Sequence, residues 1–184
     1  MNTARVILLS AALLAVSAIA FAVPDAVAGE VAVGELRLVY DDGVWAAEPL
    51  VEAQIVRFTC FSVDCGVLDG LRSDLYAIAR PASAAGWRDC EAVQATMLTH
   101  GYRDEGAFTF AKVNQAGVEF NVTGVVGICG RTRQPLIIQA CGQHDGITYW
   151  LTTGFSGCSP EPEMSKLRFD EILAGLRGST PALP

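Results

Sequence analysis

Apolar and polar residues alternate with a period of two along several short stretches of the chain, which is the pattern of strands with one buried face. The alternation is clearest at residues 118–126 and 147–155, where Val118 and Phe120, and later Tyr149, fall on the apolar side. Further strands are expected at residues 36–40, 51–58, 75–79, 107–113 and 136–141. Short joints rich in turn-forming residues connect the last four strands, so these four are expected to be antiparallel neighbours.

A helical period replaces the alternation in two places. Asp89 can cap a first helix with Cys90, Val93 and Met97 on one face, and Gly101 is placed to end it. A second helix is expected at residues 163–177, with an apolar stripe of Phe169, Ile172, Leu173 and Leu176.

Turn residues at 41–43 predict a hairpin that joins the strands at 36–40 and 51–58. The order of strands and helices then predicts an α+β fold. In this fold an antiparallel β-sheet carries two helices packed on one face, as a disulfide-stabilised two-layer sandwich.

The end of the chain carries a family resemblance. The strand Ile147-Thr148-Tyr149-Trp150-Leu151-Thr152-Thr153 runs through a short loop into the amphipathic C-terminal helix. This order of elements resembles the Mog1/PsbP-like α/β sandwich domains, although six cysteines are not part of that family's usual pattern. The resemblance implies a small accessory or binding domain rather than an enzyme, and it carries over no functional residues.

The N-terminus has the features of an export signal. Arg5 precedes an apolar run at residues 6–23, and Ala26-Val27-Ala28 is a small-residue cleavage site. We expect a cleavable signal peptide at 1–28, a single domain at 29–178 and a flexible tail at 179–184, in a periplasmic or secreted protein. The run is also about the minimum length for a spanning helix, so an uncleaved anchor is an alternative, as is a buried core helix.

Six cysteines follow the signal, at positions 60, 65, 90, 129, 141 and 158. An even set in an exported chain predicts three disulfides. The spacing and the expected strands favour Cys129–Cys158, Cys60–Cys65 and Cys90–Cys141, the last of which would clamp the first helix to the sheet. Fifteen connectivities are possible, and the choice among them stays open. A labile redox pair or a metal site is the alternative, but neither C-x-x-C spacing nor a four-ligand set occurs, so no metal and no cofactor are expected.

The charge balance narrows the class of partner. The formal net charge is −7 at pH 7, and it belongs to the mature domain because Arg5 and Asp25 cancel within the signal. An acidic surface repels phosphate backbones and anionic lipid headgroups. Nucleic acid is therefore not an expected partner, nor is membrane insertion expected after signal cleavage. Asp41-Asp42 and Asp104-Glu105 are turn-like pairs that are expected to be solvated, with a weak calcium contact as the alternative.

The solvent-exposed face of the predicted sheet is the candidate binding surface. The expected contact residues are Trp150, Thr148, Thr152, Gln139, Asn121 and Glu119, with Arg37 and Thr123 on the same face. An exposed tryptophan among hydrogen-bonding side chains is a plausible hot spot for a protein partner or a stacking platform for a sugar. The alternative is that a loop or the N-terminal segment covers Trp150.

These patterns together favour an exported, non-enzymatic accessory or binding domain that recognises another envelope or extracellular protein. One alternative is an exported enzyme, either a small hydrolase that uses Ser156 and His144 or a thiol oxidoreductase that uses Cys60 and Cys65. His144-Asp145-Gly146 is read first as a hairpin turn, because Asp-Gly is itself a turn signature. An acidic inhibitor or surface factor is a third alternative with the same fold.

Overall fold

The computed structural model describes residues 28–50, 54–61, 74–93, 107–129, 131–153 and 162–178; the side chains at 107–110, 125–129, 132–136 and 162–165 are not included. The strands are β1 (Ala28–Val33), β2 (Leu36–Asp41), β3 (Trp45–Leu50), β4 (Ile55–Cys60), β5 (Asp74–Pro81), β6 (Ala107–Gln115), β7 (Val118–Cys129), β8 (Thr132–His144), β9 (Ile147–Thr153) and β10 (Leu176–Arg177). The helix α2 spans Pro162–Ala174, and residues 90–93 are also helical.

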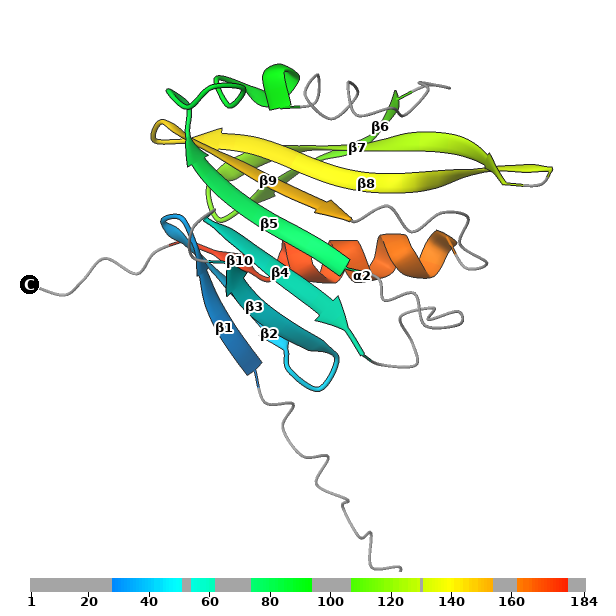
Figure 1. Cartoon of the computed structure of the whole chain (residues 1–184), viewed down its shortest axis with the longest axis horizontal. Coiled ribbons are helices and arrows are strands. Elements are labelled where there is room, and N and C mark those ends of the chain that lie inside the picture. The colour runs from blue at the N-terminus through cyan, green and yellow to red at the C-terminus, as the bar shows by residue number, and fades with distance from the viewer. Residues whose placement is uncertain are drawn as a thin grey trace, which may run out of the picture.

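The strands form two antiparallel sheets (Figure 1). The large sheet has seven strands in the order β3-β4-β5-β9-β8-β7-β6, and the small sheet has three in the order β1-β2-β10. The expectation that the last four long strands are sequential antiparallel neighbours is confirmed, because β6, β7, β8 and β9 follow one another in the large sheet.

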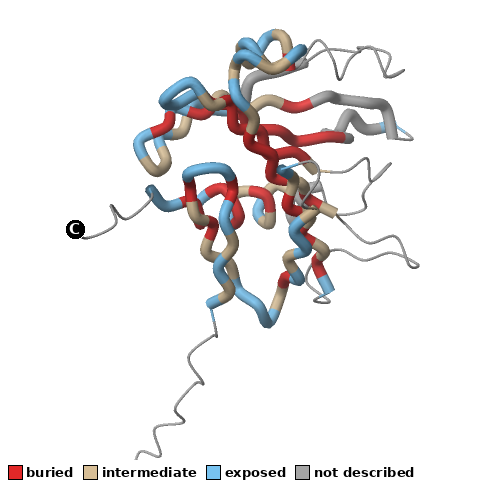
Figure 2. Tube along the Cα trace, turned by 60° about the vertical axis from the view of Figure 1, so that its left-hand side comes forward, coloured by how far each residue is buried: buried red, intermediate tan, exposed pale blue. Residues whose placement is uncertain are grey.

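One core lies between the large sheet, the small sheet and α2. The large sheet contributes the fully buried Phe58 and Phe120, the small sheet contributes Leu38, and α2 contributes Phe169 and Ile172. Figure 2 shows this buried layer running through the middle of the molecule. The alternation of the strands places their apolar residues on this side, so each strand turns its other face away from the core.

The predicted α+β sandwich with two helices on one face is wrong. The described chain is mostly β, and it has two sheets where one was expected. Moreover, the helical residues Cys90 and Val93 pack with Trp150 in a second apolar cluster, whereas α2 belongs to the core on the opposite face of the large sheet. The prediction failed because periodicity reports how an element is buried, but not which partner covers it.

The predicted hairpin at 41–43 is also wrong. The turn after β2 does not fold the next strand back onto β2: β3 enters the large sheet beside β4, and β2 pairs instead with β1 and β10.

β1 begins at Ala28, where the sequence placed the end of the signal. β8 begins before Pro135 because a register shift between Val125 and Val126 of β7 lets the long pairing continue past the proline.

The expected signal segment before Ala28 and the tail at 179–184 lie outside the described residues. So do Met97 and Gly101 of the first expected helix. In the ranges that are described, no helix is long and apolar enough to cross a membrane.

Candidate binding surface

The outer face of the large sheet, which is the face turned away from the core, carries the residues that the sequence predicted as a binding surface. Residues 82–93, which we call the covering segment, lie on this face after β5 ends at Pro81. The main chain enters the segment through a turn in which Ala84 N donates to Pro81 O, and Ala82 N donates to Gly146 O at the β8–β9 turn. The covering segment is thus tied to the sheet from its first residue.

Asp89 begins the helical end of the covering segment, as the sequence predicted. Its Oδ1 accepts a hydrogen bond from Ala92 N at 2.8 Å, and Val93 N donates to Asp89 O. This is N-cap geometry, in which a side-chain oxygen satisfies a main-chain donor of the first turn. The hydrogen bond from Ala92, followed by that from Arg88, lowers the pKa of Asp89.

A disulfide and two aromatic rings fix the covering segment to the sheet. Cys90 is bonded to Cys141 of β8, one of the pairings expected from the sequence. Trp87 meets Trp150 of β9 edge to face, with ring centroids 6.0 Å apart. Because Trp150 is the cross-strand neighbour of Cys141, the disulfide and the ring contact lie side by side.

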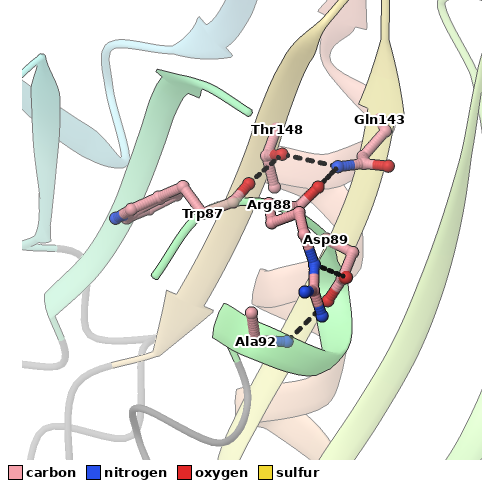
Figure 3. A network of polar contacts seen from close by, with 6 residues as sticks. All are labelled: Trp87, Arg88, Asp89, Ala92, Gln143 and Thr148. Atoms are coloured by element: carbon pink, nitrogen blue, oxygen red, sulfur yellow. Dashed lines mark hydrogen bonds and ion pairs between the residues drawn. The ribbon is translucent and has the colours of Figure 1, made fainter. Parts of the chain in front are cut away.

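Polar contacts complete the attachment (Figure 3). Thr148 Oγ1 donates to Trp87 O at 2.7 Å and accepts from Gln143 Nε2, which also donates to Arg88 O at 2.6 Å. Two main-chain carbonyl groups of the covering segment are therefore satisfied by side chains of β8 and β9.

The covering segment overturns the expectation that Trp150 is exposed. Trp150 is 6% exposed, Thr148 is fully buried, and Thr152 and Gln139 are 5% and 6% exposed. The indole Nε1–H donates to Gln139 Oε1, whose Nε2 donates to Thr123 Oγ1. The alternative reading of the sequence, that a loop covers Trp150, is the one that the structure shows, and these side chains act here as internal hydrogen-bond partners.

The other residues assigned to this face are more varied. Asn121 is half-buried, and Glu119 is exposed and paired with Lys112 at 2.9 Å. Arg37 is not on this face at all, because it belongs to β2 of the small sheet, where it pairs with Glu30.

A polar row crosses the large sheet beside the covered tryptophan. Consecutive cross-strand partners in this row, from β3 to β6, are Glu48, Arg57, Tyr76, Thr152, Gln139, Thr123 and Thr109. Each strand contributes only one residue to this row, so the row cannot be recognised from the sequence of any single strand.

Two half-buried members of the row, Arg57 of β4 and Tyr76 of β5, lie near other polar and aromatic side chains. We call Arg57, Asp74, Tyr76, Arg80 and Trp87 the β4–β5 patch; all five are half-buried. The patch borders the covering segment, since the Arg80 guanidinium lies 5.3 Å from the centre of the Trp87 ring.

Hydrogen bonds and charge hold the polar groups of the patch in place. The Asp74 carboxylate accepts from Thr59 Oγ1 at 3.0 Å and from Tyr76 Oη at 3.5 Å. Arg57 pairs with Glu48, and this hydrogen bond and charge raise the pKa of Arg57. Burial, and then the charge of Asp74, raises the pKa of Tyr76, so Tyr76 remains a neutral hydrogen-bonding group at physiological pH.

The alternative catalytic groups are not brought together in the described structure. His144 lies at the exposed end of β8, with Nε2 3.3 Å from Asp145 Oδ2, so the two neighbours in this turn do face each other. Ser156 lies outside the described residues, as do Cys65 and Cys158, and the side chain of Cys129 is not described. Cys60 is buried in the core and is disulfide-bonded.

No cluster of three His, Cys, Asp or Glu side chains suited to a metal ion occurs among the described residues. Asp41 accepts a hydrogen bond from Gly43 N in its turn. Asp104 and Glu105 lie outside the described ranges.

Sequence reasoning missed Arg57, Tyr76 and Trp87. The alternation of Val56, Phe58 and Cys60 with Arg57 and Thr59 contains the signal for β4, since it puts Arg57 opposite the core. Trp87 lies in a stretch of Ala, Ser and Gly that reads as loop, and only the disulfide reveals that this loop returns to the sheet.

Comparisons with known proteins identify no family. The sequence matches no protein-family description, and no curated protein matches it. A solved structure from Bacteroides thetaiotaomicron is similar to 81% of this chain, with 10% sequence identity and a TM-score of 0.39. The match spans 47% of that protein, so the chain covers about half of its length.

Proposed function

We propose that this protein is an exported, non-enzymatic binding domain that recognises another protein of the envelope or extracellular space through the β4–β5 patch. The observation that carries the proposal is the composition of this patch: two arginines, a tyrosine and a tryptophan, all half-buried, lie on the outer side of the large sheet. Arginine, tyrosine and tryptophan are the residue types most enriched in the hot spots of protein interfaces.

The geometry favours a protein over a carbohydrate partner. A sugar stacks on a free aromatic face, but Arg80 lies over the Trp87 ring and Trp150 meets the same ring edge to face. The side chains of the patch are partly held by their neighbours, so binding would order few new rotamers. The half-buried rings of Trp87 and Tyr76 would supply apolar contact area at their edges.

Export is supported by the cysteines. The Cys90–Cys141 disulfide holds the covering segment, and disulfides persist mainly in oxidising compartments. The signal pattern at residues 1–28 points the same way.

The test is cross-linking and affinity capture of the tagged full-length protein from its native cells. Arg57→Ala and Tyr76→Ala should each reduce the recovery of a stoichiometric partner by tenfold or more, the effect of a hot-spot residue. Arg131→Ala is the matched control, because Arg131 is exposed at the β7–β8 turn, far along the sheet from the patch. Capture that survives both patch variants would exclude this surface, and substrate turnover by the purified protein would exclude the non-enzymatic assignment.

A further inference from the structure

The edges of the two sheets differ in how well they are protected. An edge strand presents unpaired N–H and C=O groups to any extended chain, and proteins block such edges with proline, lysine, bulges or very short strands. The edge strands are β3 and β6 in the large sheet, and β1 and β10 in the small sheet.

Three of these edges carry a block. β3 contains Pro49, which has no N–H to donate. β6 has a register shift between Thr109 and Ala111 and carries Lys112. β10 is only two residues long.

β1 has none of these features. Its six residues pair with β2 in unbroken register from Ala28↔Asp41 to Val33↔Leu36, and they include no proline and no lysine. β1 forms the outer border of the small sheet (Figure 1). We propose that β1 is a docking strand, on which an extended basic segment of another protein adds as a further antiparallel strand.

The side chains of β1 indicate the chemistry of this partner. Val31 and Val33 face the core, while Glu30 and Ala32 face outward. In an added strand, the residue beside Val31 would be apolar and the residue beside Glu30 would be basic, since opposite charges across a strand pair are favourable. The Glu30 side chain is 49% exposed beside Arg37, so it remains accessible to a cation.

The charge of the whole protein supports the same kind of partner. The net charge of −7 attracts a basic segment at long range. The same charge opposes a second copy of this chain on β1, because pairing two β1 strands would also bring their Glu30 side chains close together.

The experiment uses protein purified from cells that express the full chain, and two eight-residue peptides, one alternating Val with Lys and one alternating Val with Glu. Amide hydrogen exchange reports strand addition, and fluorescence anisotropy of labelled peptide reports affinity. The Val/Lys peptide should slow exchange of the outward β1 amides at least tenfold without protecting β3 or β6, and the Val/Glu peptide should not.

A matched pair of variants tests the role of charge. Glu30→Gln should weaken Val/Lys binding by up to about fivefold, the upper range for one cross-strand pair. Glu119→Gln removes the same charge from an exposed ion pair between β7 and Lys112 of β6, and it should leave binding unchanged. Arg57→Ala, which tests the β4–β5 patch, should also leave it unchanged.

Three results would overturn the proposal. β1 amides that neither peptide protects would show that the edge does not accept a strand. Equal protection by both peptides would show that β1 does not select a basic segment. Protection that rises with protein concentration in the absence of peptide would mean that a second copy occupies β1.

Discussion

Removal of the Cys90–Cys141 disulfide is the sharpest test of how the covering segment is held. The two cysteines are 51 positions apart, and the change is Cys90→Ala together with Cys141→Ala. In the chain-entropy model, a cross-link that closes a loop of this size stabilises the folded state by about 4 kcal/mol, because it restricts the unfolded chain. Cys141 is fully buried, so loss of its sulfur also leaves a small cavity.

Urea unfolding, followed by circular dichroism without reductant, measures the change while other disulfides stay intact. We expect the free energy of unfolding to fall by about 3–5 kcal/mol. Tryptophan emission of the folded variant gives a second reading, because release of the covering segment would separate Trp87 from Trp150 and expose both rings to water. The emission should therefore shift to longer wavelength.

Thr148→Val is the control for the polar contacts. It removes the hydroxyl that bonds to Trp87 O without changing the connectivity of the chain, and it should cost about 1 kcal/mol because this partly buried hydrogen bond is lost. A loss below about 1 kcal/mol in the double cysteine variant would refute the cross-link argument. Unchanged emission would show that hydrogen bonds and ring contacts hold the segment by themselves.

Three further predictions concern the core and the strands. Phe58→Ala should lower the free energy of unfolding by about 3–5 kcal/mol, because the ring is fully buried; a loss under 1 kcal/mol in urea would contradict its place in the core. Burial raises the pKa of Tyr149 and of Tyr76, so the folded state holds these protons more tightly than the unfolded state. The free energy of unfolding should therefore fall as the pH rises above about 10. Tyr149→Phe should make this fall less steep in urea titrations, and an unchanged slope would contradict the contribution of Tyr149. Gly175→Ala would place a Cβ against the main-chain oxygen of Val39 in β2 and should lower the free energy of unfolding by about 1–3 kcal/mol. Gly178→Ala, which has open space around it, should change the free energy of unfolding by less than about 0.5 kcal/mol. Equal melting temperatures for the two variants would exclude the clash.

The sequence was a good guide to elements with local signals. The alternation of Val118, Phe120 and Val122 placed the core side of β7 correctly, and the Asp89 cap was read from residue type and position alone. The Cys90–Cys141 bridge was one of the pairings that the sequence favoured, although the sequence leaves the choice among fifteen connectivities open, and the structure confirms it.

Features that depend on long-range pairing could not be predicted in this way. β2 has the same alternation as a strand of the large sheet, yet it pairs with β1 and β10. Trp150 has polar neighbours on its face, a pattern that suits an exposed ring as well as a ring hydrogen-bonded to Gln139 beneath a loop. Only tertiary contacts decide between such arrangements, because side-chain alternation is the same in both.

The small sheet joins the two ends of the described chain. β2 lies near the start of the described residues, whereas its partner β10 follows α2 at their end, where Gln115 of β6 donates to Leu176 O. Until these distant segments meet during folding, one side of β2 lacks its native partner and the cover of Leu38 is incomplete. We therefore expect this pairing to form late in folding, because contacts between segments far apart in sequence form slowly, and the edge of β2 is open to other chains until it forms.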